Sequence, residues 1–128
     1  MAQQKTSKNL ILETSFNLAV EILKFTDTLK ESREFEIANQ IMRSGTSVGA
    51  NVREAQHPES RKDFYHKLKV AVKEAEETDY WLDLIEASGK AKIPKELRSE
   101  TKSTIRILLK ILSSTKANVY PKINKPLN

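Results

Sequence analysis

The stretch from Arg43 to Ala55, which reads RSGTSVGANVREA, decides how the fold is interpreted. Gly45 and Gly49 lie four residues apart, so on a helix they stack on one face. Glycine inside a helix costs up to about 1 kcal/mol relative to alanine, so two glycines in one segment indicate a packing requirement. The stretch therefore predicts a helix that closely approaches a neighbour at Gly45 and Gly49. A glycine-rich loop between two elements is the alternative.

The residues around this stretch favour the helix. Apolar side chains recur there at helical spacing, at Phe35, Ile37, Ala38, Ile41, Met42 and Val52. The whole chain of 128 residues has only 3 Gly and 4 Pro, a composition poor in turn residues and typical of an all-helical domain. It has no cysteine, which excludes disulfides and thiolate chemistry. No apolar run approaches the roughly 20 residues that cross a bilayer, so we expect no membrane contact and a cytoplasmic protein.

Start and stop signals divide the chain into four helices, at about residues 9–31, 33–56, 60–88 and 94–116. Pro58 ends the second helix, and Ser60 with Asp63 resembles a capping box that starts the third. Gly89 suits the left-handed position after the third helix, and Pro94 suits the first turn of the fourth. Short connections predict an all-α, antiparallel up-down-up-down four-helix bundle. We expect one domain over residues 1–128, with a polar N-terminus at 1–8 and a C-terminal tail at 117–128.

The first helix carries two apolar stripes, whereas one stripe is enough for a helix in a small bundle. One stripe has 4, 3, 4 spacing and is assigned to the core: Leu12, Phe16, Ala19 and Leu23. The other is read as a subunit interface: Ile11, Leu18, Ile22 and Phe25. Ile107 and Ile111 on the last helix likewise lie outside its core stripe of Leu97, Thr101, Ile105, Leu108 and Leu112. The surplus apolar surface predicts a homo-oligomer.

Charge is distributed unevenly along the chain. Residues 1–88 carry 12 Lys or Arg and 15 Asp or Glu, whereas residues 89–128 carry 10 and 2. On the last helix the basic residues recur every four positions, as a ridge about 18 Å long, at Arg98, Lys102, Arg106 and Lys110. Phosphates of RNA or DNA would compensate this row. The acidic third helix of the same or a neighbouring chain would compensate it equally well, so both readings stay open, as does simple solvation.

Catalytic and metal-binding patterns are weak. Glu54 and His57 have the Glu-x-x-His spacing of a di-iron bundle, and Asp63 and His66 approximate it. Both pairs flank the same helix–helix turn, which favours surface or capping roles. The chain has neither a P-loop nor a nucleophile elbow. We therefore expect no catalytic residues, no metal and no cofactor.

Two blocks of sequence resemble a known family, that of the proteins encoded in intervening sequences of bacterial 23S rRNA genes. The blocks are RSGTSVGANVREA at 43–55 and KDFYHKLKVAVKEAEETDYWL at 62–82. The resemblance implies an antiparallel four-helix bundle. It also implies a homo-oligomer, with a pentamer favoured, because a relative, the accessory protein of diversity-generating retroelements, is a basic pentameric ring that contacts nucleic acid. The expected function is a non-enzymatic, nucleic-acid-associated accessory protein that binds RNA phosphates through the basic ridge. The alternative is an oligomeric scaffold that docks an acidic protein partner.

Overall fold

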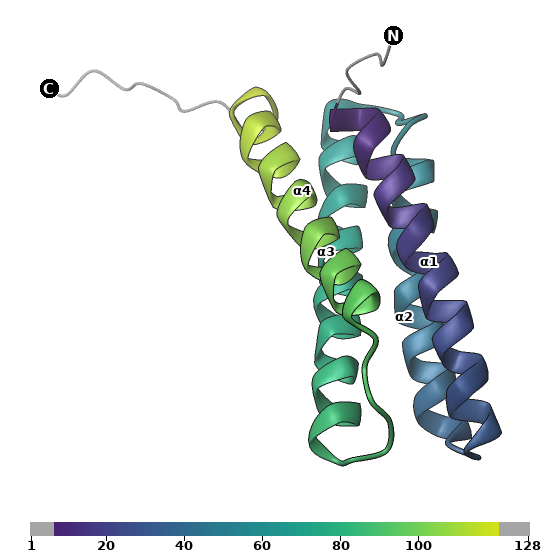
Figure 1. The fold of residues 1–128 in the computed structure, drawn as a ribbon. Helices are drawn as coiled ribbons and strands as arrows, with labels where there is room; N and C mark the ends of the chain where they lie inside the picture. The colour runs from purple at the N-terminus through teal and green to yellow at the C-terminus, as the bar shows by residue number, and fades with distance from the viewer. Residues whose placement is uncertain (1–6, 121–128) are drawn as a thin grey trace, which may run out of the picture.

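A computed structural model describes residues 7–120 and contains four helices in that range (Figure 1). They are α1 (Ser7–Glu31), α2 (Phe35–Glu54), α3 (Arg61–Ala87) and α4 (Lys95–Val119). The all-α prediction is confirmed, and the helix ends lie within three residues of the predicted ones. Residues 1–6 and 121–128, which hold most of the predicted N-terminus and tail, lie outside the described residues. No described helix is long and apolar enough to span a membrane.

Local signals set the helix ends as the sequence predicts. The Ser60 hydroxyl accepts a hydrogen bond from the Asp63 amide at 3.0 Å, while the Asp63 carboxylate accepts one from the Glu59 amide at 3.0 Å. Gly89 follows α3 with a φ of 73°, the left-handed geometry that glycine adopts without a Cβ clash. Pro94 differs slightly from the prediction, because it directly precedes α4 rather than occupying its first turn.

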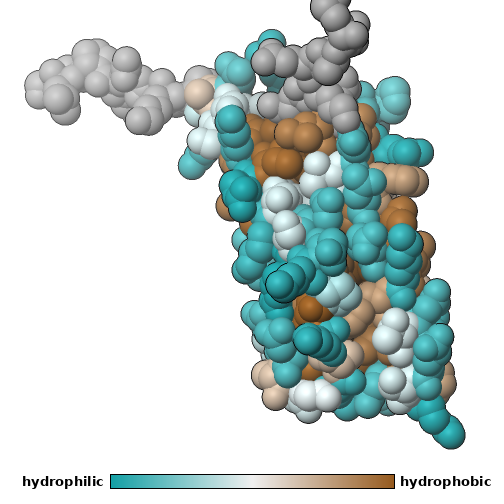
Figure 2. Space-filling view, viewed as in Figure 1, coloured by the Kyte–Doolittle hydropathy of each residue, from teal (hydrophilic) through white to brown (hydrophobic). Residues whose placement is uncertain are grey.

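The four helices pack side by side as a closed four-helix bundle. Each helix contacts the helix or helices next to it in sequence, and α4 returns to contact α1. Consecutive helices run in opposite directions, and α4 lies obliquely, so that its C-terminal end is far from α1 (Figure 1). Figure 2, seen from the same side, shows hydrophobic residues at the surface between the upper parts of α1 and α4. Ile107 and Ile111 of α4 are half-buried and pack against the core.

The two glycines of α2 bring this helix against α1. A Cβ atom built on Gly45 would lie 2.6 Å from Ile22 Cγ1 and 2.9 Å from Ile22 Cγ2. A Cβ on Gly49 would lie 3.3 Å from the Ser15 carbonyl oxygen. Residues 43–54 are helical, so the loop alternative is wrong and the close approach at Gly45 and Gly49 is confirmed.

The assignment of the two α1 stripes was inverted. The four side chains predicted at a subunit interface are in the core of the single chain: Ile11 (1% exposed), Leu18 (0%), Ile22 (0%) and Phe25 (4%). The stripe assigned to the core is the outer one, with Phe16 58% and Leu23 47% exposed and Leu12 and Ala19 half-buried.

The buried face of α1 also contains polar residues that belong to neither predicted stripe. Ser15 and Thr26 are 1% exposed and stand among the core residues. Their hydroxyls donate to carbonyl oxygens of the same helix, Ser15 to Leu12 at 3.3 Å and Thr26 to Leu23 at 2.9 Å. These bonds remove most of the cost of burying the hydroxyls. The inner face therefore looks more polar in sequence than it is in the fold.

Candidate nucleic-acid interface

The seam between α3 and α4 has two parts, and the first is a charge-paired region near the connection between these helices. Arg98 Nη1 donates to Asp83 at 2.6 Å and lies 3.5 Å from Asp79, and Arg98 Nη2 donates to Glu86 at 3.3 Å. Lys102 donates to Asp79 at 2.8 Å. We call this cluster of Arg98, Lys102, Asp79, Asp83 and Glu86 the paired end.

The paired end divides the predicted basic ridge. Two of its four cations, Arg98 and Lys102, are neutralised by the acidic residues of α3, which is one of the three readings that the sequence left open. Arg106 and Lys110 are exposed, and within residues 7–120 no carboxylate lies within 4.0 Å of either. The structure thus does not bring the four residues together as one unpaired surface.

The second part of the seam is a groove at the opposite end of the same helix pair. From α3 it is lined by Tyr65, Lys69, Val72, Lys73 and Glu76. From α4 it is lined by Leu109, Leu112, Ser113 and Lys116. We call this feature the basic groove, because it holds three lysines and one glutamate.

The lysines of the basic groove are available to a ligand. Lys69, Lys73 and Lys116 are exposed and form no ion pair within the described residues. Lys69 Nζ lies 5.7 Å from the centre of the Tyr65 ring, a cation–π distance. Leu109 is 48% exposed, whereas Val72 and Leu112 are buried and form an apolar floor.

The groove adjoins the unpaired half of the ridge. Arg106, Leu109, Lys110 and Ser113 follow i, i+3, i+4, i+7 spacing, so they are neighbours on one face of α4. Two of them line the groove. The unpaired surface therefore contains five cations from two helices: Lys69, Lys73, Arg106, Lys110 and Lys116.

Sequence reasoning missed the contribution of α3. Lys69 and Lys73 lie on a helix whose charge is dominated by carboxylates farther along, so they did not stand out. Their spacing of four residues places them on one face, which was the available signal. Joining them to Lys116 requires the antiparallel register of α3 and α4, which the sequence does not contain.

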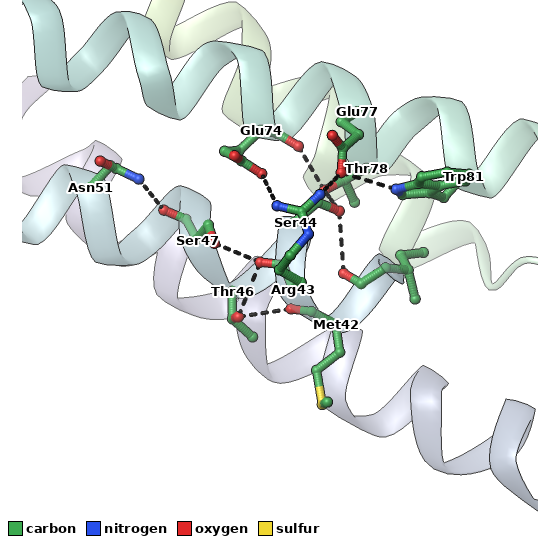
Figure 3. A network of polar contacts seen from close by, with 11 residues as sticks. Met42, Arg43, Ser44, Thr46, Ser47, Asn51, Glu74, Glu77, Thr78 and Trp81 are labelled. Carbon is green, nitrogen blue, oxygen red and sulfur yellow. Dashed lines mark hydrogen bonds and ion pairs between the residues drawn. The ribbon is translucent and has the colours of Figure 1, made fainter. Parts of the chain in front are cut away.

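The opening stretch performs a different role, because its polar residues hold α2 against α3 (Figure 3). Arg43 donates to Glu74 at 3.2 Å and also to Glu77, which accepts a further hydrogen bond from Trp81 Nε1 at 3.1 Å. Beside this pair, the buried hydroxyl oxygens of Ser44 and Thr78 are 2.8 Å apart. These residues are committed to helix packing.

On the flank of α4 that faces α1, like charges lie near one another, whereas the paired end joins opposite charges. Burial raises the pKa of Glu100, and the nearby carboxylates of Glu21 and Glu13 raise it further.

No group of three or more His, Asp or Glu residues within the described range is placed to hold a metal ion. His57 and His66 are exposed.

These features define a four-helix bundle with an unpaired cationic surface on α3 and α4. The chain belongs to the family of 23S rRNA-intervening sequence proteins, which matches residues 7–114. A solved structure from Bacteroides thetaiotaomicron VPI-5482, described as a protein of unknown function from the S23 ribosomal protein family, is 37% identical. The alignment covers 84% of this chain and 99% of that one, with a TM-score of 0.79. No curated protein matches the chain.

Proposed function

We propose that this protein is a non-enzymatic, oligomeric accessory protein that binds RNA through its phosphates. The observation that carries the proposal is the unpaired cationic surface of Arg106, Lys110 and the basic groove. The family's connection with an rRNA gene is compatible with it. Arg98 and Lys102, the other half of the ridge, are assigned to internal pairing rather than to RNA.

Electrostatics give the proposal a measurable form. Each cation that neutralises a phosphate of a single strand adds about −0.7 to the slope of log K against log[salt]. Five cations give a slope of about −3.5, so affinity falls roughly 100-fold between 50 and 200 mM salt. If several copies assemble, the surface is repeated and weak contacts add through multivalency.

The test is fluorescence anisotropy with a labelled RNA at several salt concentrations. Arg106→Gln with Lys110→Gln should weaken binding and make the salt slope shallower by about 1.4. The matched control is Arg98→Gln with Lys102→Gln, which removes the same charge from the same helix. Because these two cations are already paired, the control should keep nearly the wild-type slope.

Two results would contradict the proposal. An equal loss in both double variants would mean that net charge, and not the unpaired surface, governs binding. No binding to RNA at low salt would remove RNA as the ligand. A polyglutamate chain that binds under the same conditions would then favour the scaffold with an acidic protein partner.

We propose that the copies associate through two apolar surfaces on different sides of α1. One is the outer stripe with Phe16 and Leu23, next to α2, and the other lies between α1 and α4, with Ile107 and Ile111. Two unlike surfaces suit a head-to-tail contact, which closes into a ring when the rotation permits. Because Phe16 and Leu23 are exposed in the single chain, they replace the four core residues first predicted at the interface.

Light scattering tests the assembly. Phe16→Glu with Leu23→Glu, or Ile107→Glu with Ile111→Glu, should each lower the particle mass toward one chain while circular dichroism shows the helices retained. Glu36→Gln, at an exposed position away from both surfaces, is the control. An unchanged mass in either double variant would show that its surface is not an interface.

A further inference from the structure

We infer that the basic groove takes single-stranded RNA, with its phosphates on the lysines and a base stacked on Tyr120. This inference rests on the proposed function and adds the conformation of the RNA. It depends on two observations beyond the charge of the surface. One is the apolar floor of the groove, and the other is an aromatic pair beside it.

The groove combines charge and apolar surface in an arrangement that suits an open strand. Lys69 and Lys73 stand on α3 and Lys116 stands on α4, so cations lie on both sides. Leu109 of α4 also lines the groove, where it presents apolar surface and is 48% exposed. A flexible single strand can direct its phosphates to the lysines while its bases cover the apolar surface.

Tyr120 supplies a place for a base to stack. Its ring is 5.5 Å from that of Tyr65, at an interplanar angle of 76°. Tyr65 is 9% exposed and is fixed in the groove, whereas Tyr120 is 54% exposed. The edge-to-face contact therefore orients the Tyr120 ring in advance and leaves much of its surface open. From the sequence alone, the lack of aromatic residues between the basic ones argues against a base-stacking platform. Tyr65 and Tyr120 are 55 positions apart and meet only in the fold.

A duplex satisfies less of this surface. Its bases are stacked inside, so it offers mainly phosphates and riboses. It could contact the outward-facing Arg106 and Lys110, but it would leave Leu109 and Tyr120 without a partner. An acidic peptide would satisfy the lysines and likewise leave the aromatic ring unused. The combination of features therefore favours unpaired nucleotides.

The experiment compares two labelled RNAs at one salt concentration, an unstructured oligouridylate and a hairpin duplex of equal charge. Wild-type protein should bind the oligouridylate at least several-fold more tightly. Tyr120→Ala should weaken that binding by about 5- to 100-fold, the loss measured for one stacked base, and change duplex binding little. Tyr80→Ala is the matched control, because Tyr80 is equally exposed (55%) but lies on the α3 segment that carries the paired end.

A second substitution guards against a local change at the end of α4. Leu109→Ser removes apolar surface from the groove and should also weaken oligouridylate binding, whereas Leu84→Ser, at another exposed leucine of the helix pair, should not. Equal affinity for both RNAs, or tighter duplex binding, overturns this inference and leaves phosphate binding intact. No binding of either RNA at low salt overturns the proposed function itself. Equal losses in Tyr120→Ala and Tyr80→Ala would also overturn the stacking role.

Discussion

The α1–α2 and α3–α4 seams join helices of similar length in opposite ways. Along α1–α2, Gly45 and Gly49 let the two helices approach closely, and a Cβ atom on Gly45 would lie only 2.6 Å from Ile22 Cγ1. Along α3–α4, contact is made by long charged side chains at one end and gives way to a groove at the other. The first seam is closely packed, whereas the second leaves polar and apolar side chains exposed, where a ligand can contact them. Stability and binding should therefore respond to different seams.

The largest expected effect is in the α1–α2 seam. Gly45→Leu places a side chain against the stiff, β-branched Ile22 and should lower the free energy of unfolding by about 3 kcal/mol. Gly49→Leu should cost only about 1 kcal/mol, because this position borders a surface groove into which the side chain can turn. Urea denaturation measures both. Equal costs would mean that the two glycines do not differ in the way their surroundings indicate.

The next effect is in the paired end. Asp79→Ala removes the carboxylate that both Arg98 and Lys102 contact, and its side chain is only 17% exposed. The free energy of unfolding should fall by about 1–2 kcal/mol, because a partly buried, charge-assisted bond is lost while solvent screens the remaining cations. Glu76→Ala, also on α3 but in the unpaired groove, should stay within about 0.5 kcal/mol of wild type. A similar loss in both variants would remove the distinction between the two ends of the seam.

A third change, a double substitution, makes the paired end more like the basic groove, because it removes two carboxylates that pair with Arg98. Asp83→Asn with Glu86→Gln leaves Arg98 with Asp79 alone, at 3.5 Å, and should cost less than about 1 kcal/mol. RNA binding should strengthen, and its salt slope should steepen by up to about 0.7, the contribution of one cation. Glu31→Gln with Glu36→Gln changes the same charge at exposed positions on α1 and α2. An equal gain in that control would attribute the effect to net charge.

The smallest effect concerns the other flank of α4. Burial, with Glu21 and Glu13, raises the pKa of Glu100 above its usual 4.5, so the folded state holds this proton more tightly than the unfolded state. Stability from this group is therefore present below pH 4.5 and is lost as pH rises through the raised pKa. Glu100→Gln should stabilise the protein by a few tenths of a kcal/mol at neutral pH, and the gain should vanish below pH 4.5.

Thermal melts at several pH values measure this change, and Glu96→Gln on the same helix is the control. Because Glu96 lies in the first turn of α4, where a negative charge is favourable, its loss should slightly destabilise the protein at neutral pH. If the gain in stability from Glu100→Gln does not depend on pH, the pKa of Glu100 is not raised in the folded protein.

Much of the fold could be predicted because its signals are local. Pro58, Ser60 and Gly89 mark helix ends by backbone chemistry that acts within a few residues, and the glycines of α2 indicate close packing wherever the partner helix lies. The inner face of α1 could not be chosen, because both its stripes are apolar and periodicity gives spacing without direction. The true core face also includes Ser15 and Thr26, whose buried hydroxyls bond to carbonyl oxygens of the same helix.

The candidate site depends on information that is not local. The spacing of Arg98, Lys102, Arg106 and Lys110 predicted a ridge correctly as a row on one helix. Which of these cations pair with carboxylates depends on the register of α3 against α4, so the sequence left phosphate binding, internal pairing and solvation as alternatives. In the fold Arg98 and Lys102 take internal pairing, while Arg106 and Lys110 stay candidates for phosphate.

The oblique course of α4 has a consequence for how the native state fluctuates. Its N-terminal half is tied to α3 by the paired end, whereas its C-terminal half diverges from α1 and borders the open groove (Figure 1). Segments with fewer buried contacts open at a free energy below that of global unfolding. Amide protons in the last turns of α4 should therefore exchange with solvent before those of α2. An RNA strand lying along the groove would contact both α3 and the C-terminal half of α4. Bound RNA would therefore make this half-helix more ordered, and a more ordered half-helix would bind RNA more tightly.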